Sequence, residues 1–205
     1  MILFVHGWGY DASFWDPLRK ALNMPSAALD LGYFGPTETT MPDGISLLVG
    51  HSLGFLWLAR QVALKHLPLI GINAFPRFEE AEGYRPAVAP RVLERMRRRV
   101  LTDPRGVLAE FWQRAGAPGP SNSPKTAALA EGLDHLATWD ERENLGTHTR
   151  SIRLIAGEED AIVPAAMTKV AFGDFTIEWL PGGHALPRTH ARDLARLIRP
   201  TMEAR

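Results

Sequence analysis

The chain has 205 residues and a mass of 22.7 kDa, enough for one globular domain with a small insertion. Its 23 basic residues balance 23 acidic residues, so we expect no nucleic-acid partner. The absence of cysteine excludes disulfides, cysteine-ligated metals and a thiol nucleophile. No signal-peptide pattern and no apolar run of membrane-spanning length occurs, so we expect a soluble cytoplasmic monomer without a membrane span.

Six short apolar runs are expected to form strands. They show little alternation of polar and apolar residues, which is typical of a parallel sheet covered by helices on both faces. The runs are 2–5, 27–31, 46–49, 69–73, 152–156 and 175–180. Helical patterns at 14–22, 53–64 and 191–198 accompany them, and the alternation predicts an α/β fold with right-handed crossovers.

Between residues 76 and 139 no strand is predicted. Three helical patterns follow one another instead, at 91–101, 104–115 and 125–137. Asp103 and Ser123 each precede a proline, a combination that favours a helix start. We therefore predict a helical cap (lid) over 76–139, inserted into an α/β core formed by 1–75 and 140–205.

The strongest motif is the Gly-x-Ser-x-Gly segment at 50–54, with Ser52 at its centre. It follows a predicted strand and opens a predicted helix, as a nucleophile elbow does. The glycines are needed because the turn is too tight for side chains, and the serine is held on a strained backbone with its hydroxyl exposed. The alternative is a glycine-rich turn whose serine only caps the helix.

A serine nucleophile needs a base and a carboxylate that orients the base. In hydrolases with this elbow the partners follow in the order Ser, Asp or Glu, His. Asp160 comes just after the fifth predicted strand, and His184 after the sixth, where open α/β sheets bind ligands. We predict Ser52, Asp160 and His184 as the catalytic residues. Glu158 and Glu159 stay open as alternatives for the acid.

Other acids and histidines are weaker candidates. Asp140 lies near the cap boundary and Asp174 before the last predicted strand. His51 is too close to Ser52 in the chain to reach it easily, and His190 lies at the start of the last predicted helix. Three more lie on or near predicted helices and connectors: His66, His135 and His148.

An oxyanion hole would complete such a site. The segment His-Gly-Trp-Gly at 6–9 directly follows the first predicted strand. We predict the backbone N–H groups of Trp8 and Leu53 as the two donors, because they lie after the first strand and after the serine. Trp8 can at the same time pack in the core.

Taken together, segments 6–9, 50–54, 157–164 and 182–184 resemble the α/β-hydrolase family. The His-Gly-Trp-Gly opening, the Phe14-Trp15 pair, the helical insertion and the small size resemble the pimeloyl-acyl-carrier-protein methyl ester esterases of biotin synthesis. That family usually has two strands before the His-Gly segment, so the resemblance describes an N-terminally shortened α/β-hydrolase fold. It implies a serine carboxylester hydrolase that uses no metal or cofactor.

The predicted cap is basic. From Arg77 to Arg114 nine arginines face six acidic residues, an excess of about +3 in a chain of zero net charge. The resemblance implies an acidic acyl carrier protein as partner, and the expected docking residues are Arg91, Arg95, Arg98 and Arg99. We expect Trp8, Phe111 and Trp112 to bind the acyl chain. A solvated helix face and simple packing of the cap are the alternatives.

The favoured function is cleavage of the methyl ester of a pimeloyl chain carried on acyl carrier protein. A generic esterase or thioesterase for small acyl groups would have the same triad and oxyanion hole. A non-catalytic binding protein with this fold is a third reading, but such proteins usually lose a member of the triad, and here all three are present.

Overall fold

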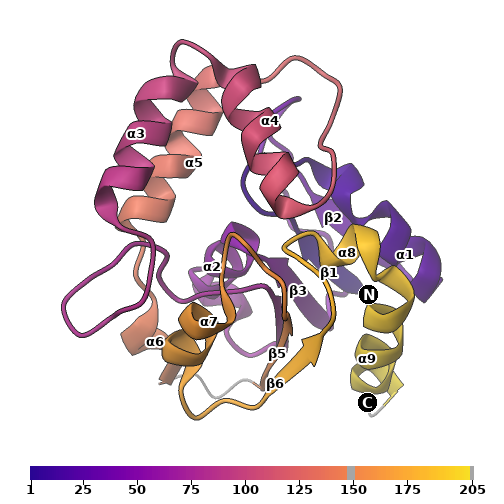
Figure 1. Cartoon of the computed structure of the whole chain (residues 1–205). Helices are drawn as coiled ribbons and strands as arrows, with labels where there is room; N and C mark the ends of the chain where they lie inside the picture. Colours follow the sequence, from indigo (N-terminus) through magenta and orange to yellow (C-terminus); the bar gives the residue numbers. More distant parts are fainter. Residues whose placement is uncertain (147–150, 204–205) are drawn as a thin grey trace.

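The computed structural model describes residues 1–146 and 151–203 of the chain. Its centre is a six-stranded sheet in the order β2-β1-β3-β4-β5-β6, in which every neighbouring pair is parallel (Figure 1). The strands are β1 Ile2–Val5, β2 Ser26–Leu29, β3 Leu47–His51, β4 Leu69–Ile72, β5 Ile152–Gly157 and β6 Ile177–Leu180. All six predicted strands are confirmed, with ends shifted by no more than two residues.

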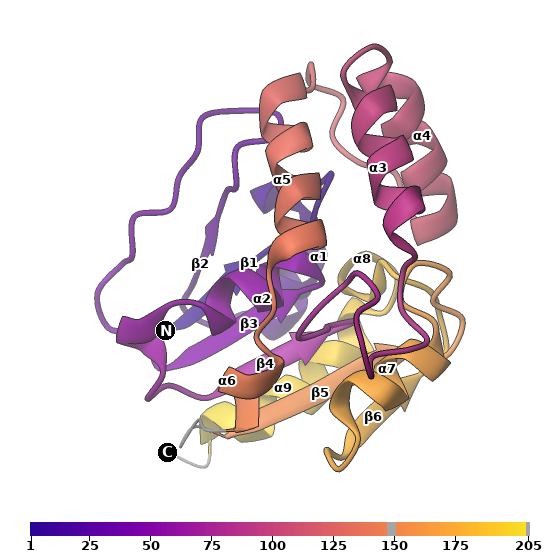
Figure 2. The ribbon, with the colours of Figure 1, turned by 90° about the vertical axis from the view of Figure 1, so that its left-hand side faces the viewer.

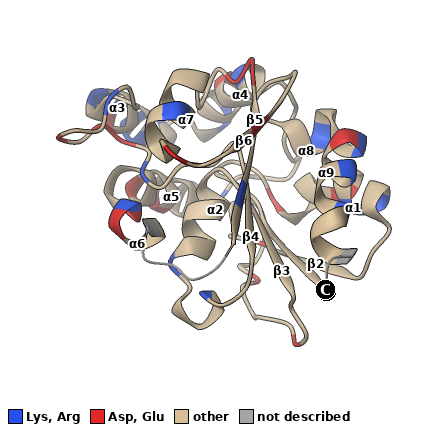
Figure 3. Ribbon diagram, turned by 90° about the horizontal axis from the view of Figure 1, so that it is seen from below, with Lys and Arg blue, Asp and Glu red and all other residues tan. Residues whose placement is uncertain are grey.

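Helices cover both faces of the sheet. Ile2 and Phe4 of β1 belong to one buried apolar cluster, and Leu3 and Val5 belong to the other, as expected for alternating side chains. Helices α1 (Asp16–Leu22), α8 (Leu186–Thr189) and α9 (Ala191–Glu203) supply the first cluster. Helices α2 (Leu53–Ala59) and α6 (Arg142–Gly146) supply the second, together with the end of α7 (Ala165–Phe172). Figure 3 shows that the strands in the middle of the molecule are largely without charged residues.

Several helices differ from the prediction. The predicted helix 14–22 is a 3₁₀ turn, η1 (Ala12–Trp15), followed by α1, because Pro17 in the first turn of α1 has no N–H to continue the preceding turn. The predicted helix 53–64 ends at Ala59, and a second 3₁₀ turn, η2 (Val62–Leu64), follows. Helices α6, α7 and α8 were not predicted, since segments of four to eight residues are too short to show a helical period.

Three helices, α3 (Pro90–Val100), α4 (Pro104–Ala115) and α5 (Thr126–Thr138), lie between β4 and β5 in the chain. They form a layer at one end of the sheet (Figures 1 and 2). Asp103 caps α4 as predicted, because its side chain accepts a hydrogen bond from the N–H of Gly106. The predicted start of α5 at Ser123 is two residues early, since Lys125 occupies the N-cap position without a side-chain bond.

The two ends of segment 76–139 meet at a cluster of ion pairs. Arg77 Nη1 lies 3.1 Å from Asp140 Oδ2, and Arg142 Nη2 lies 2.8 Å from the same oxygen. The hydrogen bonds from Arg142 hold the pKa of Asp140 below its ordinary value. Nearby, Arg60 pairs with the buried Glu141 at 2.7 Å. These contacts fix the position at which the three helices join the sheet.

None of the helices in the described part of the chain combines the length and the apolar character that a membrane crossing requires.

Candidate active site

Ser52 lies at the sharp turn between β3 and α2. Its backbone has φ 54° and ψ −124°, a strained conformation for a residue with a side chain. A Cβ atom added to Gly54 would lie 2.5 Å from the oxygen of His6, and one added to Gly50 would lie 2.6 Å from the nitrogen of Phe55. Both neighbours are backbone atoms that cannot move aside cheaply. The glycines of the motif therefore permit α2 to start directly against the sheet.

The segment after β1 packs against this turn. A Cβ atom on Gly7 would lie 2.9 Å from the Cβ of Ser52. Trp8 follows, with its indole donating to the oxygen of Leu129 in α5 at 2.9 Å and its ring 5.1 Å from that of Phe111. Leu53 is the first residue of α2, where a backbone N–H has no acceptor within the helix. Segment 6–9 and the start of α2 thus lie side by side at the serine.

Asp160 and His184 form a buried pair. His184 Nδ1 lies 2.7 Å from Asp160 Oδ2, and because a carboxylate only accepts, the proton is on Nδ1. Asp160 Oδ1 accepts two further bonds, from the N–H groups of Ile162 at 2.7 Å and Val163 at 2.8 Å. The two open alternatives, Glu158 and Glu159, are both exposed. The carboxylate that contacts His184 is therefore that of Asp160.

The second ring nitrogen of His184 has no partner. Nε2 is buried and makes no hydrogen bond within the described residues, so it does not bond to the hydroxyl of Ser52. A buried nitrogen without a partner costs free energy, and such groups are enriched at functional sites. With Nδ1 protonated, Nε2 carries a lone pair and can accept a proton. Hydrogen bonds between a catalytic base and its nucleophile are often long before substrate binds.

Two side chains for which we predicted no role also contact this site. Asn73, which directly follows β4, and His51, the last residue of β3, both donate hydrogen bonds to the main-chain oxygen of His184. We predicted Asn73 as the last residue of a strand, but its φ of 48° shows that the strand has already ended. Nothing in the local pattern indicates a partner more than a hundred residues away.

A cavity of about 620 Å³ opens over Ser52, between the sheet and helices α3, α4 and α5. Much of its lining is apolar and includes Trp8, Leu93, Met96 and Phe111. Trp112, which we expected to bind the acyl chain, is not among the residues that line it. The Trp112 indole instead donates to the oxygen of Gly9 at 2.8 Å, tying α4 to the segment after β1.

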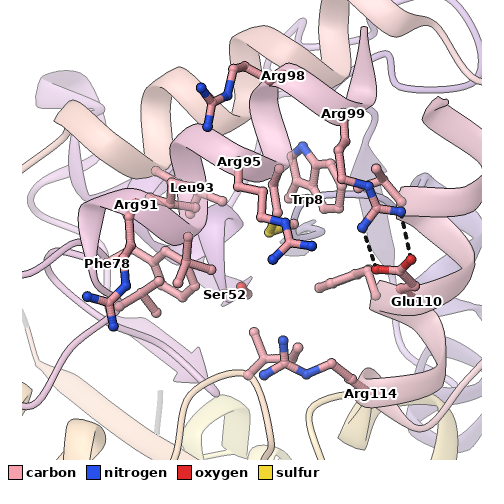
Figure 4. Close-up of a pocket in the computed structure, with 17 residues that line it drawn as sticks. Trp8, Ser52, Phe78, Arg91, Leu93, Arg95, Arg98, Arg99, Glu110 and Arg114 are labelled. Atoms are coloured by element: carbon pink, nitrogen blue, oxygen red, sulfur yellow. Dashed lines mark hydrogen bonds and ion pairs between the residues drawn. The ribbon is translucent and has the colours of Figure 1, made fainter. Parts of the chain in front are cut away.

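Arginines surround the cavity. Arg99 makes two hydrogen bonds to Glu110, at 2.8 and 2.7 Å, and Arg98 pairs with Glu94 at 3.7 Å, so these two charges are compensated. Three further arginines of the lining make no ion pair within 4.0 Å among the described residues, although Arg95 helps to lower the pKa of Glu110: Arg91, Arg95 and Arg114. Figure 4 shows these three around the opening, with Ser52 lying between them in this view. The free positive charge thus lies beside Ser52.

The other histidines have different surroundings. His6 is buried, and its Nε2 accepts from the N–H of Leu31 at 3.0 Å. His135 stacks on Trp139 with ring centroids 3.9 Å apart, and His190 bonds to the neighbouring threonine. His66 is exposed, and His148 lies outside the described residues. Across residues 1–146 and 151–203, no three His, Asp or Glu side chains are grouped as metal ligands.

The architecture and the serine turn place the protein among the α/β-hydrolases. An esterase from Exiguobacterium antarcticum superposes with a TM-score of 0.83 at 15% identity, over 98% of this chain and 91% of that one. No family model matches the chain. The pimeloyl-[acyl-carrier protein] methyl ester esterase of Stenotrophomonas maltophilia (strain K279a) is 30% identical over 96% of this chain and 90% of its own length. The chain belongs to the family of these esterases.

A longer relative contains a second activity. The biotin biosynthesis bifunctional protein BioHC of Cellvibrio japonicus is 27% identical over 81% of this chain. The chain spans 39% of the length of that bifunctional protein. The relatives that are named esterases support ester hydrolysis as the general chemistry of this chain, whereas structural neighbours at 14–18% identity show the fold alone.

Proposed function

We propose that this protein is a serine carboxylester hydrolase in which Ser52 is the nucleophile, His184 the base and Asp160 the residue that orients it. The observation that carries the proposal is the buried Asp160–His184 pair, whose second nitrogen is unpartnered, in a fold that holds Ser52 on a strained turn. The unpartnered lone pair on His184 Nε2 supports the role of proton acceptor.

The reaction follows from these positions. Ser52 Oγ attacks the ester carbonyl and gives its proton to His184 Nε2, while the N–H groups of Trp8 and Leu53 stabilise the oxyanion. The imidazolium returns the proton to the departing alcohol, which leaves an acyl group on Ser52. Water then attacks that acyl-enzyme, with His184 again accepting a proton, and the free acid is released.

The substrate we propose is the methyl ester of a pimeloyl chain on acyl carrier protein. The names of the relatives support this choice. An apolar cavity of about 620 Å³ suits an acyl chain, and segment 76–139 serves as its lid. Arg91 and Arg95 form no direct ion pair among the described residues, and Arg95 is only electrostatically coupled to Glu110, so both are available to an acidic carrier. Arg98 and Arg99, already paired, contribute less than Arg91 and Arg95.

Labelling with a fluorophosphonate tests the nucleophile, because an activated hydroxyl attacks phosphorus as it attacks a carbonyl. We expect one label, at Ser52, and no label in Ser52→Ala. Ester hydrolysis in that variant should fall by roughly a thousandfold or more without a change in thermal unfolding. Labelling that persists in Ser52→Ala would contradict the assignment.

Charge reversal tests the carrier. Arg91 and Arg95 lie one turn apart on α3, so Arg91→Glu with Arg95→Glu reverses one face. We expect kcat/KM for the carrier-bound ester to fall by about tenfold or more, and its KM to rise with salt in the parent. A short nitrophenyl ester should be affected far less. Arg192→Glu on α9 makes the same change of charge away from the cavity and should affect neither substrate. Equal effects on both esters would favour a generic esterase or thioesterase instead.

A further inference from the structure

The main-chain oxygen of His184 is held by two side chains from different strands. Asn73 Nδ2 donates to it at 2.7 Å and also to the oxygen of Gly183 at 3.1 Å. His51 Nε2 donates to the same oxygen of His184 at 2.9 Å. Since a carbonyl only accepts, the His51 ring has its proton on Nε2. His184 is therefore fixed at its backbone as well as at its ring.

Asn73 joins three strand ends. Its own N–H donates to the oxygen of Ile155 in β5 at 2.9 Å, and its Oδ1 accepts from the N–H of Gly157 at 2.8 Å. Its φ of 48° lies in the left-handed region, which asparagine tolerates better than most residues. One side chain thus links the end of β4, the end of β5 and the loop after β6, with every polar atom of its amide engaged.

His51 is fully buried, and its Nδ1 has no hydrogen-bond partner within the described residues. Its ring centroid lies 4.6 Å from that of His184. Burial, and then the neighbouring His184, hold the pKa of His51 well below its ordinary value, so the ring stays neutral. Within residues 1–146 and 151–203, the hydrogen bond to His184 is the one polar contact that offsets the cost of burying this ring.

We propose that His51 and Asn73 are positioning residues that clamp the main chain of His184 and so keep its imidazole against Asp160 while it exchanges a proton with Ser52. This inference rests on the proposed function, because it assigns the clamp to the proposed base. A displacement of a catalytic group by about 1 Å slows a reaction by about a hundredfold, which sets the scale of the effect.

Paired substitutions at His51 separate the hydrogen bond from the volume of the ring. In His51→Gln the amide nitrogen is as many bonds from Cα as Nε2 and can still donate, whereas His51→Leu cannot. We expect kcat for a nitrophenyl ester to stay within about twofold of the parent in His51→Gln and to fall by about tenfold in His51→Leu. KM should change by less than about twofold in both. His51→Leu with Asn73→Ala should lower kcat by about a hundredfold.

Arg153→Met is the control for a general loss of stability. Arg153, in the first half of β5, bonds to Glu178 and to α9, away from Ser52. Its loss should lower the midpoint of thermal unfolding but leave kcat unchanged. A second readout is the strongly deshielded proton between His184 Nδ1 and Asp160 in the proton NMR spectrum. It should persist in His51→Gln and Arg153→Met and be broadened or lost in His51→Leu and in the double variant.

The inference is overturned if His51→Leu and His51→Gln have the same kcat. It is also overturned if Arg153→Met loses as much activity as His51→Leu does. If the double variant does not fold, the two His51 variants decide. Full activity in Ser52→Ala would refute the proposed function instead. In that case the NMR signal alone judges the clamp: its loss in His51→Leu supports the clamp, and an unchanged signal refutes it.

Discussion

Replacement of Asp160 by asparagine and by alanine should separate stability from activity. The carboxylate accepts three hydrogen bonds, two at Oδ1 from backbone N–H groups and one at Oδ2 from His184. Asparagine retains an oxygen for the two backbone donors, but its amide nitrogen faces His184 and cannot accept. The imidazole then shifts its proton to Nε2, and the atom that should take the proton of Ser52 already has one. Alanine removes both acceptor oxygens and with them all three hydrogen bonds.

The expected magnitudes follow from this count. In Asp160→Ala the buried N–H of Val163 and the partly buried N–H of Ile162 lose their acceptor at about 1–3 kcal/mol each, so the free energy of unfolding should fall by about 2–6 kcal/mol. In Asp160→Asn it should fall by about 1 kcal/mol, since only the bond to His184 is exchanged. Both variants should lose about 10³–10⁴-fold in kcat. Asparagine deprives His184 Nε2 of its lone pair, and alanine deprives the His184 ring of its orientation.

Urea unfolding gives the stabilities, and hydrolysis of a nitrophenyl ester at constant pH gives the rates. The midpoint of thermal unfolding should move by about 2–4 °C for each kcal/mol in a chain of this size. The reasoning would be refuted if Asp160→Asn kept more than about a tenth of the parent activity. It would also be refuted if the two variants had equal stability, because the backbone bonds to Oδ1 would then contribute nothing.

Three further predictions concern the surroundings of the site. Gly54→Ala places a Cβ atom 2.5 Å from the oxygen of His6 and should destabilise the protein by about 3 kcal/mol or more. Gly35→Ala, where the added Cβ atom has no neighbour within 4 Å, should not destabilise the protein. Equal midpoints of unfolding for the two variants would contradict this prediction. Because the pKa of His51 is held well below its ordinary value, below about pH 6.5 the unfolded chain binds a proton there that the folded chain does not. Urea unfolding should therefore show the parent losing up to ~1.4 kcal/mol per pH unit relative to His51→Gln on acidification, and parallel curves throughout would rule this out. Trp112→Phe should lower the free energy of unfolding by about 1 kcal/mol with little change in kcat/KM for a short ester, and a large rise in KM at unchanged stability would return Trp112 to the acyl site.

Features that depend on a few neighbouring residues were predicted well. The six strands are apolar runs, fully buried in β1, β3 and β4 and partly buried in β2, β5 and β6. The serine turn needs glycine at two fixed positions, because a side chain there would clash with the backbone of β1 or of α2. Asp160 and His184 each follow a strand of one parallel sheet, which predicted that they lie at the same edge, and their side chains are hydrogen-bonded to each other. Helices α3, α4 and α5 were also predicted from the sequence, since each has at least eleven residues and shows a helical period.

Other features depend on contacts between segments far apart in the chain, and only the tertiary structure decided them. The sequence favoured Asp160 but left Glu158 and Glu159 open as alternatives, and only the folded loop buries Asp160 against His184 and leaves the two glutamates exposed. The bonds from Asn73 to His184 span more than a hundred residues, so no local pattern indicates them. The sequence by itself determined a serine turn with an acid and a histidine in the right order, because the turn and each strand depend on residues that are close together in the chain. Which acid meets the histidine, which side chains hold it and which arginines stay unpaired depend on packing across the sheet and the cap.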